Sequence, residues 1–260
     1  MRTTHGLPRH PTTRLSHLVR ELAFRRRLQW RHWLNWILDR ASDGYFDRKF
    51  GISSSERRSL ARLGLDLPDC NDYQPVSYRD LRKLLDSVPI CPQDVFLDFG
   101  SGMGRALCLA AQYPFRSVVG VEISPELCDI ARRNIDRVKT KLRCHDIQIV
   151  NNNAIDYKIP SDISIVYFFN PFVREVMRHV LENVAASLRA APRRILLLFS
   201  GTASTEAFRN EVKGHGWLAL RSEIILPTGT MGLVYANNEW TGEDSGATSG
   251  SSSDSIGATY

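Results

Sequence analysis

Glycines and carboxylates near the middle of the chain have a spacing that suits the binding of a nucleotide-like cofactor. One apolar run ends in Asp98, and a second apolar run ends in Glu122. The turn between them carries glycine at alternate positions, at Gly100, Gly102 and Gly104. A strand, a glycine turn, a helix and a strand that ends in a carboxylate predict a nucleotide-binding βαβ unit. The glycines let the backbone approach the ligand, and Glu122 can accept hydrogen bonds from both ribose hydroxyls.

The glycine spacing also distinguishes between cofactors. A dinucleotide fingerprint that starts at Gly100 needs glycine at position 105, where this chain has Arg105. The pattern Asp-x-Gly-x-Gly-x-Gly instead resembles motif I of the class I S-adenosylmethionine-dependent methyltransferases. That cofactor has a sulfonium and an α-ammonium and no pyrophosphate, so a carboxylate such as Asp98 is useful beside it. The alternatives are NAD binding and a turn that only links strand to helix.

The resemblance implies a role for each residue of this unit. The turn from Gly100 through Ser101 and Gly102 to Gly104 would hold the methionine half of the cofactor. Asp98 would bind the ammonium, directly or through water. Glu122 would bind the ribose, and Ile123 would pack on the adenine.

A run of asparagines follows the third predicted strand, at residues 151–153, and Ala154 comes next. Many members of the class have Asp-Ala at this point, with the Asp accepting a hydrogen bond from the adenine amino group. Asn153 can do the same through its amide oxygen, without the charge. The alternative interpretation is a cluster of turn residues.

The fourth predicted strand ends in Asn170-Pro171-Phe172. This sequence resembles motif IV of N-methyltransferases, whose Asn/Asp-Pro-Pro-Tyr/Phe loop presents an acceptor and an aromatic wall to an amine. The resemblance implies that Asn170 and the carbonyl of the following peptide accept the amine's N–H bonds. Phe172 would stack on a flat substrate or wall the methyl group. The chain has one proline fewer than the motif, and the alternative is a strand-ending turn.

No general base is obvious among His145, His179 and His215, and no Ser/His/Asp set or metal-ligand cluster stands out. Composition is that of an ordinary globular protein, with 260 residues, 43% hydrophobic and 24% charged. Five scattered cysteines suggest reduced thiols, so we expect a cytoplasmic protein and not a disulfide frame. The sequence predicts neither a secretory signal nor a membrane span.

Charge is concentrated near the N-terminus. Residues 1–40 hold nine arginines against Glu21 and Asp39, within a net charge of +6 for the chain. A helical period over residues 14–40 puts aromatic and apolar residues, including Trp30 and Trp33, opposite the arginines. We expect a basic helical extension. It could pack on the core, dock nucleic acid or an acidic partner, or lie on an anionic membrane surface.

Strands alternating with helices predict a mostly parallel sheet with helices on both faces. A loop is expected over residues 43–54, and a short helix over 54–63. A second loop is expected over residues 69–75, and a second helix over 78–87. The strands are expected at 94–99, 117–122, 146–150, 163–169 and 194–200, with a hairpin at 217–225 and 231–236. The remaining helices are expected at 104–113, 125–137, 172–190 and 204–213.

These elements define an α/β fold that resembles the seven-stranded, Rossmann-like class I methyltransferases over residues 73–236. Residues 1–72 would be the basic helical extension, and residues 237–260 a disordered, acidic Ser/Gly-rich tail. Upstream, Phe46-Asp47, residues 51–54 and Tyr73-Gln-Pro-Val-Ser77 resemble the lead-in of a bacterial methyltransferase family. They are also loosely similar to the seven-strand protein lysine methyltransferases, whose Tyr-x-Pro-Ser/Thr loop implies that Tyr73 contacts the cofactor.

The sequence therefore predicts an S-adenosylmethionine-dependent methyltransferase that N-methylates an amine of a protein, such as lysine, or of another macromolecule. A small-molecule O- or N-methyltransferase is the first alternative. The second is a non-catalytic protein of the same fold that binds the cofactor or RNA. The methyl acceptor itself is not written in the sequence.

Overall fold

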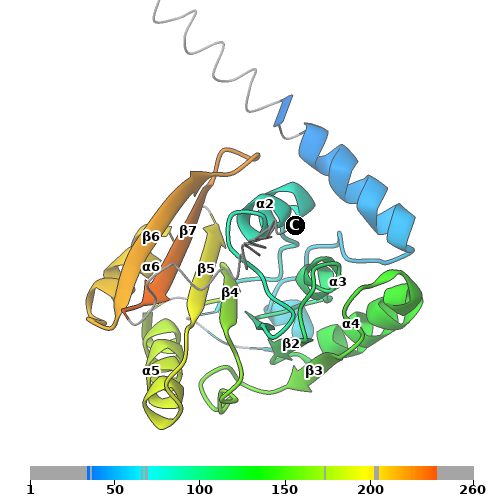
Figure 1. Ribbon diagram of the computed structural model, residues 1–260. Coiled ribbons are helices and arrows are strands. Elements are labelled where there is room, and N and C mark those ends of the chain that lie inside the picture. Colours follow the sequence, from blue (N-terminus) through cyan, green and yellow to red (C-terminus); the bar gives the residue numbers. More distant parts are fainter. Residues whose placement is uncertain are drawn as a thin grey trace, which may run out of the picture.

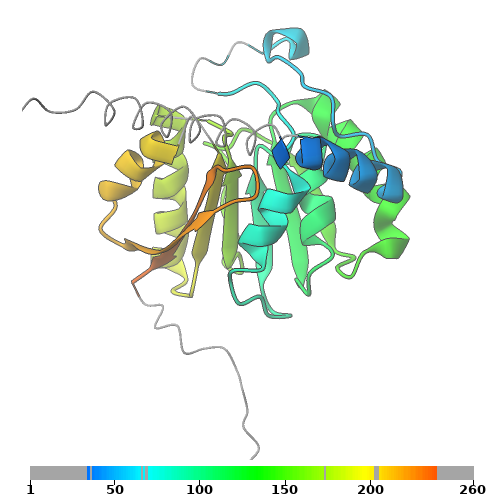
Figure 2. The same ribbon diagram turned by 90° about the horizontal axis from the view of Figure 1, so that it is seen from above.

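A seven-stranded sheet forms the centre of the structure, and helices cover both of its faces (Figures 1 and 2). The structure is a computed structural model that describes residues 34–35, 37–65, 67, 70–172, 174–201 and 205–238. The first five strands are parallel, and β7 is antiparallel to both of its neighbours. In sheet order the strands are β3 (Ile147–Asn151), β2 (Ser117–Glu122), β1 (Val95–Phe99), β4 (Ile165–Phe169), β5 (Leu196–Gly201), β7 (Met231–Asn237) and β6 (Leu218–Ile225).

Each face of the sheet has its own helices and its own apolar core. One face packs against α2 (Tyr78–Leu85) and α3 (Arg105–Ala110), and the other against α5 (Arg174–Ala190) and α6 (Thr205–Lys213). Strand β1 is buried along its whole length, because alternate residues serve the two cores. The other described helices are the one over residues 34–35 and 37–50, η1 (Ala61–Leu63), α4 (Pro125–Val138) and η2 (Lys139–Lys141).

The strand order positions a ligand site at one edge of the sheet. Strand β1 has β2 on one side and β4 on the other, so the chain changes direction across the sheet at β1. In open α/β sheets, ligands bind at the carboxyl ends of the strands beside such a switch point. The residues that follow β1, β2 and β4 are the glycine turn, Ile123 and Asn170, which is where the sequence predicts the site.

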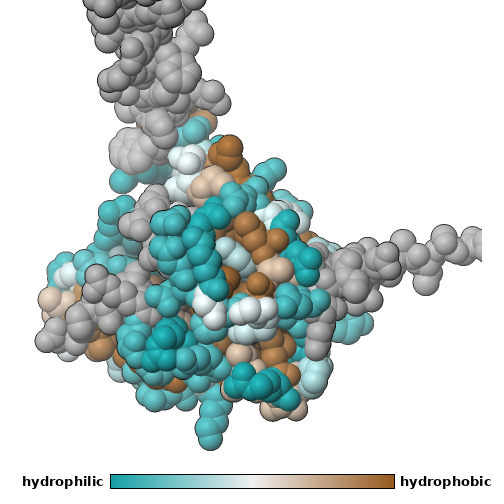
Figure 3. All heavy atoms as spheres, turned by 90° about the vertical axis from the view of Figure 1, so that its left-hand side faces the viewer, coloured by the Kyte–Doolittle hydropathy of each residue, from teal (hydrophilic) through white to brown (hydrophobic). Residues whose placement is uncertain are grey.

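The predicted α/β fold is confirmed, and each core strand lies within two residues of its expected bounds. The expected hairpin is β6–β7, with β6 at the edge of the sheet. Figure 3 views this side of the molecule, where hydrophobic patches lie among hydrophilic residues. Leu220 and Ile225 of β6 are among the exposed hydrophobic side chains, and Ile225 is 76% exposed.

Two expectations upstream of β1 are wrong. Residues 43–50 are helical, although we expected a loop, and the turn comes only at Gly51. Residues 54–60 are not helical, and the expected helix shrinks to the 3-10 turn η1. Most of the predicted basic helix, including Trp30 and Trp33, and almost all of the predicted tail lie outside the described residues. Among the described helices, none has the length and apolar character needed to cross a membrane.

Candidate cofactor and methyl-acceptor site

The glycine turn after β1 is shaped by contacts that only glycine permits. Gly102 has a φ of 54°, and a Cβ built on it would lie 2.1 Å from the ring of Tyr73. Gly104 has a φ of 79°, and its Cβ would lie 3.0 Å from the Cβ of Ala131 in α4. Side chains here would be strained and would push apart the segments that cover the turn. The spacing seen in the sequence is therefore a packing requirement as well as a cofactor signature.

Glu122, at the end of β2, holds this turn in place. Its carboxylate accepts hydrogen bonds from the backbone N–H groups of Gly102 and Ser124, both at 2.9 Å. Burial raises the pKa of Glu122, and the backbone hydrogen bonds oppose that rise. A carboxylate has about four acceptor sites, so Glu122 keeps capacity for the two hydroxyls of a ribose. Sequence reasoning anticipated a ligand contact here and missed the bond to the turn.

Asp98 is a buried carboxylate that has no described hydrogen-bond partner. It is 3% exposed and lines a small cavity together with Tyr73 and Ser101. Burial, together with the nearby charge of Glu122, raises the pKa of Asp98 well above its usual range. The hydroxyl of Ser101 is also buried and without a partner among the described residues. Unsatisfied buried groups of this kind suit a ligand that brings a cationic donor.

A larger cavity of about 390 Å³ lies on the other side of Tyr73. It brings together residues from the ends of β1, β2, β3 and β4 and from the loop before α2. Nine of the predicted site residues line it: Tyr73, Gly100, Glu122, Ile123, Asn153, Ala154, Asn170, Pro171 and Phe172. Asp98, Ser101, Gly102 and Gly104 do not line this cavity. Gly100 and Tyr73 line both cavities, so the two lie side by side.

The loop after β4 has an unusual backbone. Asn170 has a φ of 44°, the left-handed conformation that asparagine tolerates better than most residues. Its side-chain oxygen would lie 1.9 Å from a Cβ built on Gly201, so the side chain packs on the bare backbone of β5. Phe172 is buried, with its ring edge-on to Phe99 and Phe168. Phe172 therefore lines the cavity and also belongs to the apolar core between the sheet and α5.

Asn71 contacts this loop through two donors. Its backbone N–H donates to the carbonyl of Pro171 at 3.1 Å, and its Nδ2 donates to the carbonyl of Asn170 at 2.8 Å. The Pro171 carbonyl, which the motif IV resemblance assigns to the substrate, therefore has one lone pair in use and one left. Nothing in the sequence pattern indicated this contact.

Asn153 makes a turn as well as lining the cavity. Its side-chain oxygen accepts a hydrogen bond from the N–H of Ile155 at 3.1 Å, and Asn152 accepts from the N–H of Asn153 in the same way. The bond from Ile155 closes an Asx turn, whereas Asn152 bonds the adjacent residue, and both fit the cluster of turn residues that the alternative interpretation described. The amide oxygen of Asn153 keeps a second lone pair, so its predicted contact with adenine remains a prediction.

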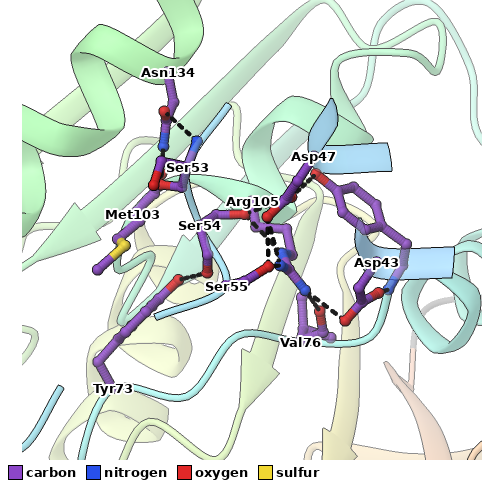
Figure 4. A network of polar contacts seen from close by, with 11 residues as sticks. Asp43, Asp47, Ser53, Ser54, Ser55, Tyr73, Val76, Met103, Arg105 and Asn134 are labelled. Carbon is purple, nitrogen blue, oxygen red and sulfur yellow. Dashed lines mark hydrogen bonds and ion pairs between the residues drawn. The ribbon is translucent and has the colours of Figure 1, made fainter. Parts of the chain in front are cut away.

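Arg105, the first residue of α3, ties the glycine turn to the segment upstream of β1 (Figure 4). It is 2% exposed, and all five of its N–H donors are used. It bonds two carboxylates, of Asp43 at 2.7 Å and Asp47 at 3.1 Å, together with the hydroxyls of Ser54 and Ser55 and the carbonyl of Val76. The sequence drew attention to Arg105 only as the residue that breaks a dinucleotide pattern.

Asn134 of α4 makes a second set of contacts that hold the glycine turn against the upstream segment. The Asn134 amide donates to the carbonyls of Ser53 and Met103 and accepts from the N–H of Ser53 (Figure 4). Met103 stands between two glycines of the turn, so Asn134 fixes the turn and the upstream segment to one helix. Tyr73 completes the enclosure, because its hydroxyl donates to the carbonyl of Ser54 at 2.9 Å while its ring covers Gly102.

The strand order, the glycine turn and Glu122 after β2 are together the arrangement of a class I methyltransferase. Residues 71–164 match the family model of histone methylation protein DOT1. The chain therefore has the fold of the class I, seven-strand methyltransferases, and over residues 71–164 it is similar to the DOT1 family. The unsatisfied Asp98 carboxylate suits the ammonium of S-adenosylmethionine, and the buried Glu122 carboxylate suits its ribose.

Two relatives carry more specific names. The chain is 28% identical over 112 residues to a protein-lysine N-methyltransferase of Saccharolobus islandicus, which covers 43% of this chain and 68% of that protein. It is 42% identical over 53 residues to a histone-lysine N-methyltransferase of Caenorhabditis elegans that is specific for H3 lysine-79. That match covers 20% of this chain and 6% of the nematode protein.

Solved structures with a similar arrangement are more distant. One is an RNA methyltransferase from Salinibacter ruber in complex with S-adenosyl-L-homocysteine, with a TM-score of 0.48 and 18% identity. The match covers 65% of this chain and 97% of that one. Another is a methyltransferase from Aquifex aeolicus, with a TM-score of 0.48 and 13% identity over 62% of this chain and 90% of that one.

Proposed function

We propose that this protein transfers a methyl group from S-adenosylmethionine to the side-chain amine of a lysine in another protein. The observation that carries the proposal is the 390 Å³ cavity, which is lined both by six of the predicted cofactor residues and by the Asn170-Pro171-Phe172 loop. Similarity to protein-lysine methyltransferases supports lysine as the acceptor.

The charge of the cavity favours a cationic acceptor. Its described lining includes the carboxylates of Asp72 and Glu122 and no basic side chain. Glu122 is engaged with the glycine turn, whereas the Asp72 carboxylate is exposed and, within the described part of the chain, accepts a hydrogen bond from the N–H of Leu60 alone. A lysine ammonium is attracted to such a site, and a phosphate-bearing acceptor is repelled. Leu60, Phe169 and Val176 offer apolar walls for the lysine stem.

The residues act mainly through position. When bound, S-adenosylmethionine supplies a methyl group on a positively charged sulfur, which leaves as a neutral thioether as the amine lone pair forms the N–C bond. The Asp72 carboxylate attracts the lysine ammonium as it arrives, and the ammonium then releases one proton to solvent to become the neutral, nucleophilic amine. Asn170 and the remaining lone pair of the Pro171 carbonyl then accept the N–H bonds and aim the amine lone pair. Phe172 and Phe169 keep water from the reacting atoms.

Labelling tests the proposal directly. The full chain is incubated with tritiated S-adenosylmethionine and cell lysate, and the products are separated into protein, RNA and small molecules. We expect label in protein, released as methyllysine after acid hydrolysis. Glu122→Ala is the matched control and, at a cofactor concentration below its dissociation constant, should label protein about tenfold less than the wild type. Label confined to RNA or to small molecules contradicts the proposal and favours one of those acceptors.

We further propose that the arginine-rich residues 1–40 recruit an acidic partner or nucleic acid. The support is their charge, since nine arginines face two acidic residues in that segment. Replacing Arg25, Arg26 and Arg27 with Gln should raise KM for a macromolecular substrate and flatten its dependence on salt, with cofactor affinity unchanged. An unaltered KM at low salt removes this proposal.

Location and domain boundaries are proposed on chemistry and composition. None of the five cysteines, all of which lie in the described part of the chain, forms a disulfide, which supports a reducing compartment such as the cytoplasm. We propose residues 73–236 as the methyltransferase domain, with residues 1–72 as its N-terminal extension and residues 237–260 as a tail. The tail contains Glu239, Glu243, Asp244 and Asp254 and no basic residue.

A further inference from the structure

Several described residues between Arg58 and Tyr73 lie against the larger cavity, and we refer to the described part of residues 58–73 as the cap loop. Its two ends are joined by paired backbone hydrogen bonds, from Arg58 to Tyr73 at 3.2 Å and from Tyr73 to Arg58 at 2.8 Å. Inside the loop, Asp72 accepts from the N–H of Leu60 at 2.8 Å. The described cap-loop residues that line the cavity are Leu60, Cys70, Asn71, Asp72 and Tyr73.

The cap loop is joined to the acceptor loop Asn170-Pro171-Phe172 through Asn71. Two consecutive carbonyls of the acceptor loop accept from Asn71, one from its backbone N–H and one from its side-chain amide. Cys70 also forms an isolated antiparallel bridge with Phe172. Residues about 100 positions apart in the sequence are thus paired as a short two-stranded contact, and all of them line the cavity.

The bond from the Asn71 side chain falls on the residue with the strained backbone. Asn170 has a φ of 44°, and a left-handed residue that is not glycine persists only where its surroundings fix it. Gly201 holds the Asn170 side chain by close packing, and Asn71 holds the Asn170 carbonyl. Both constraints act on Asn170, a residue that lines the larger cavity.

We propose that Asn71 is a positioning residue that fixes the acceptor loop in its reactive conformation and so couples the cap loop to methyl transfer. This inference rests on the proposed function. Asn71 acts through Asn170 and Pro171, and it need not touch the reacting atoms. Its loss should lower kcat, because the acceptor loop then samples conformations that do not aim the amine. Cofactor binding should change little, because Glu122 and the glycine turn are held by other contacts.

Two substitutions of Asn71 remove the hydrogen bond of its side chain and leave its backbone N–H in place. Asn71→Asp keeps the shape and the backbone N–H, but a carboxylate cannot donate to the Asn170 carbonyl. Asn71→Ala removes the side-chain bond without adding charge. Ser59→Ala is the matched control, since it removes a hydroxyl from the exposed part of the same loop that does not line the cavity.

Two measurements test the inference on the full chain. Hydrogen exchange of the peptide that spans residues 165–173 should be faster in Asn71→Ala and Asn71→Asp than in the wild type and in Ser59→Ala. With polylysine as the acceptor, kcat should fall roughly three- to tenfold in both Asn71 variants, with the S-adenosylmethionine Kd within about twofold of the wild-type value.

The outcomes separate this inference from the proposed function. Unchanged exchange in both Asn71 variants shows that Asn71 does not hold the loop and overturns the inference. Faster exchange with unchanged kcat overturns the positioning role. A wild type that methylates neither polylysine nor lysate protein contradicts the proposed function, and the exchange data then still decide whether Asn71 fixes the loop.

Discussion

Replacing Arg105 with methionine should destabilise the protein strongly, because it removes five hydrogen bonds and leaves two carboxylates without their cation. The side chains of Asp43 and Asp47 are 18% and 11% exposed, so water compensates them poorly. Removing one partner of a buried ion pair lowers the free energy of unfolding by about 3–5 kcal/mol. Methionine has a similar length and fills most of the space, so cavity formation adds little.

Both aspartates keep other hydrogen-bond donors in Arg105→Met, so we expect a loss of stability near the lower end of that range. Asp47 keeps hydrogen bonds from Ser54, Ser55 and Tyr78, and Asp43 keeps one from the N–H of Tyr78. We therefore expect a loss of about 3 kcal/mol in the free energy of unfolding. For a chain of this size, that corresponds to a fall in Tm of roughly 6–12 °C.

The dependence on pH adds a second signature. Burial raises the pKa of Asp43, and Arg105 opposes that rise. Without Arg105 the pKa should rise further, above its value in the unfolded chain. A carboxyl group with such a shift destabilises the folded state while it is ionised, and this penalty disappears as pH falls through the folded-state pKa. The Tm deficit of Arg105→Met should therefore shrink between pH 8 and pH 5.

Thermal unfolding of Arg105→Met and Arg116→Met, each compared with the wild type, provides the assay. Arg116 pairs with Asp162 on the surface, where both side chains are 51% exposed, so its removal should cost less than about 1 kcal/mol. Arg105→Lys should fall between the two, since an ammonium has three donors and cannot reproduce the fork. Equal Tm values for the two methionine variants, or a deficit that grows as pH falls, would refute the reasoning.

Three further predictions concern the site. Glu122→Ala should weaken S-adenosylmethionine binding about tenfold or more in calorimetry, and unchanged affinity contradicts the ribose role. The same substitution should lower Tm, because it removes the acceptor of two backbone N–H groups. The affinity of the wild type for this cationic cofactor should fall as pH decreases through the raised pKa of Asp98. Asp98→Asn should flatten this dependence on pH. A wild-type affinity that does not depend on pH argues against ammonium binding by Asp98. Asn170→Gly and Asn170→Ala should reduce turnover equally strongly, although glycine adopts the left-handed backbone of this position without the strain that alanine would have. Wild-type turnover in either variant contradicts the acceptor role.

The sheet and its helices could be predicted because their signals are local. Buried parallel strands are continuous apolar runs, and α4 begins with Ser124 as its N-cap and a proline directly after it. The helix over residues 43–50 was missed because Asp43, Gly44 and Asp47 are poor helix formers. The two aspartates lie four residues apart and bind one arginine, so a tertiary contact outweighs local propensity. That spacing, read together with Arg105, was the available signal.

The expected helix at residues 54–63 fails for a related reason. Ser54 and Ser55 each donate to Asp47 and accept from Arg105, and the backbone of Ser53 pairs with Asn134. Three consecutive residues reach partners on different elements, which an extended chain allows and a helix does not. The residue types of the site could be predicted from motifs. The contacts of Asn71 could not, because they join segments far apart in the sequence.

The contacts around the glycine turn make the segment upstream of β1 a structural part of the site. All five bonds of Arg105 go to residues between Asp43 and Val76, and Asn134 bonds this segment and the turn at once. Tyr73 covers Gly102 on the cofactor side, while Asn71 holds the acceptor loop. The boundary that the resemblance places at residue 72 therefore falls between Asn71, which bonds the Asn170 carbonyl, and Tyr73, which covers the glycine turn. A single upstream segment organises both halves of the site, so a change in its packing should alter cofactor binding and acceptor placement together.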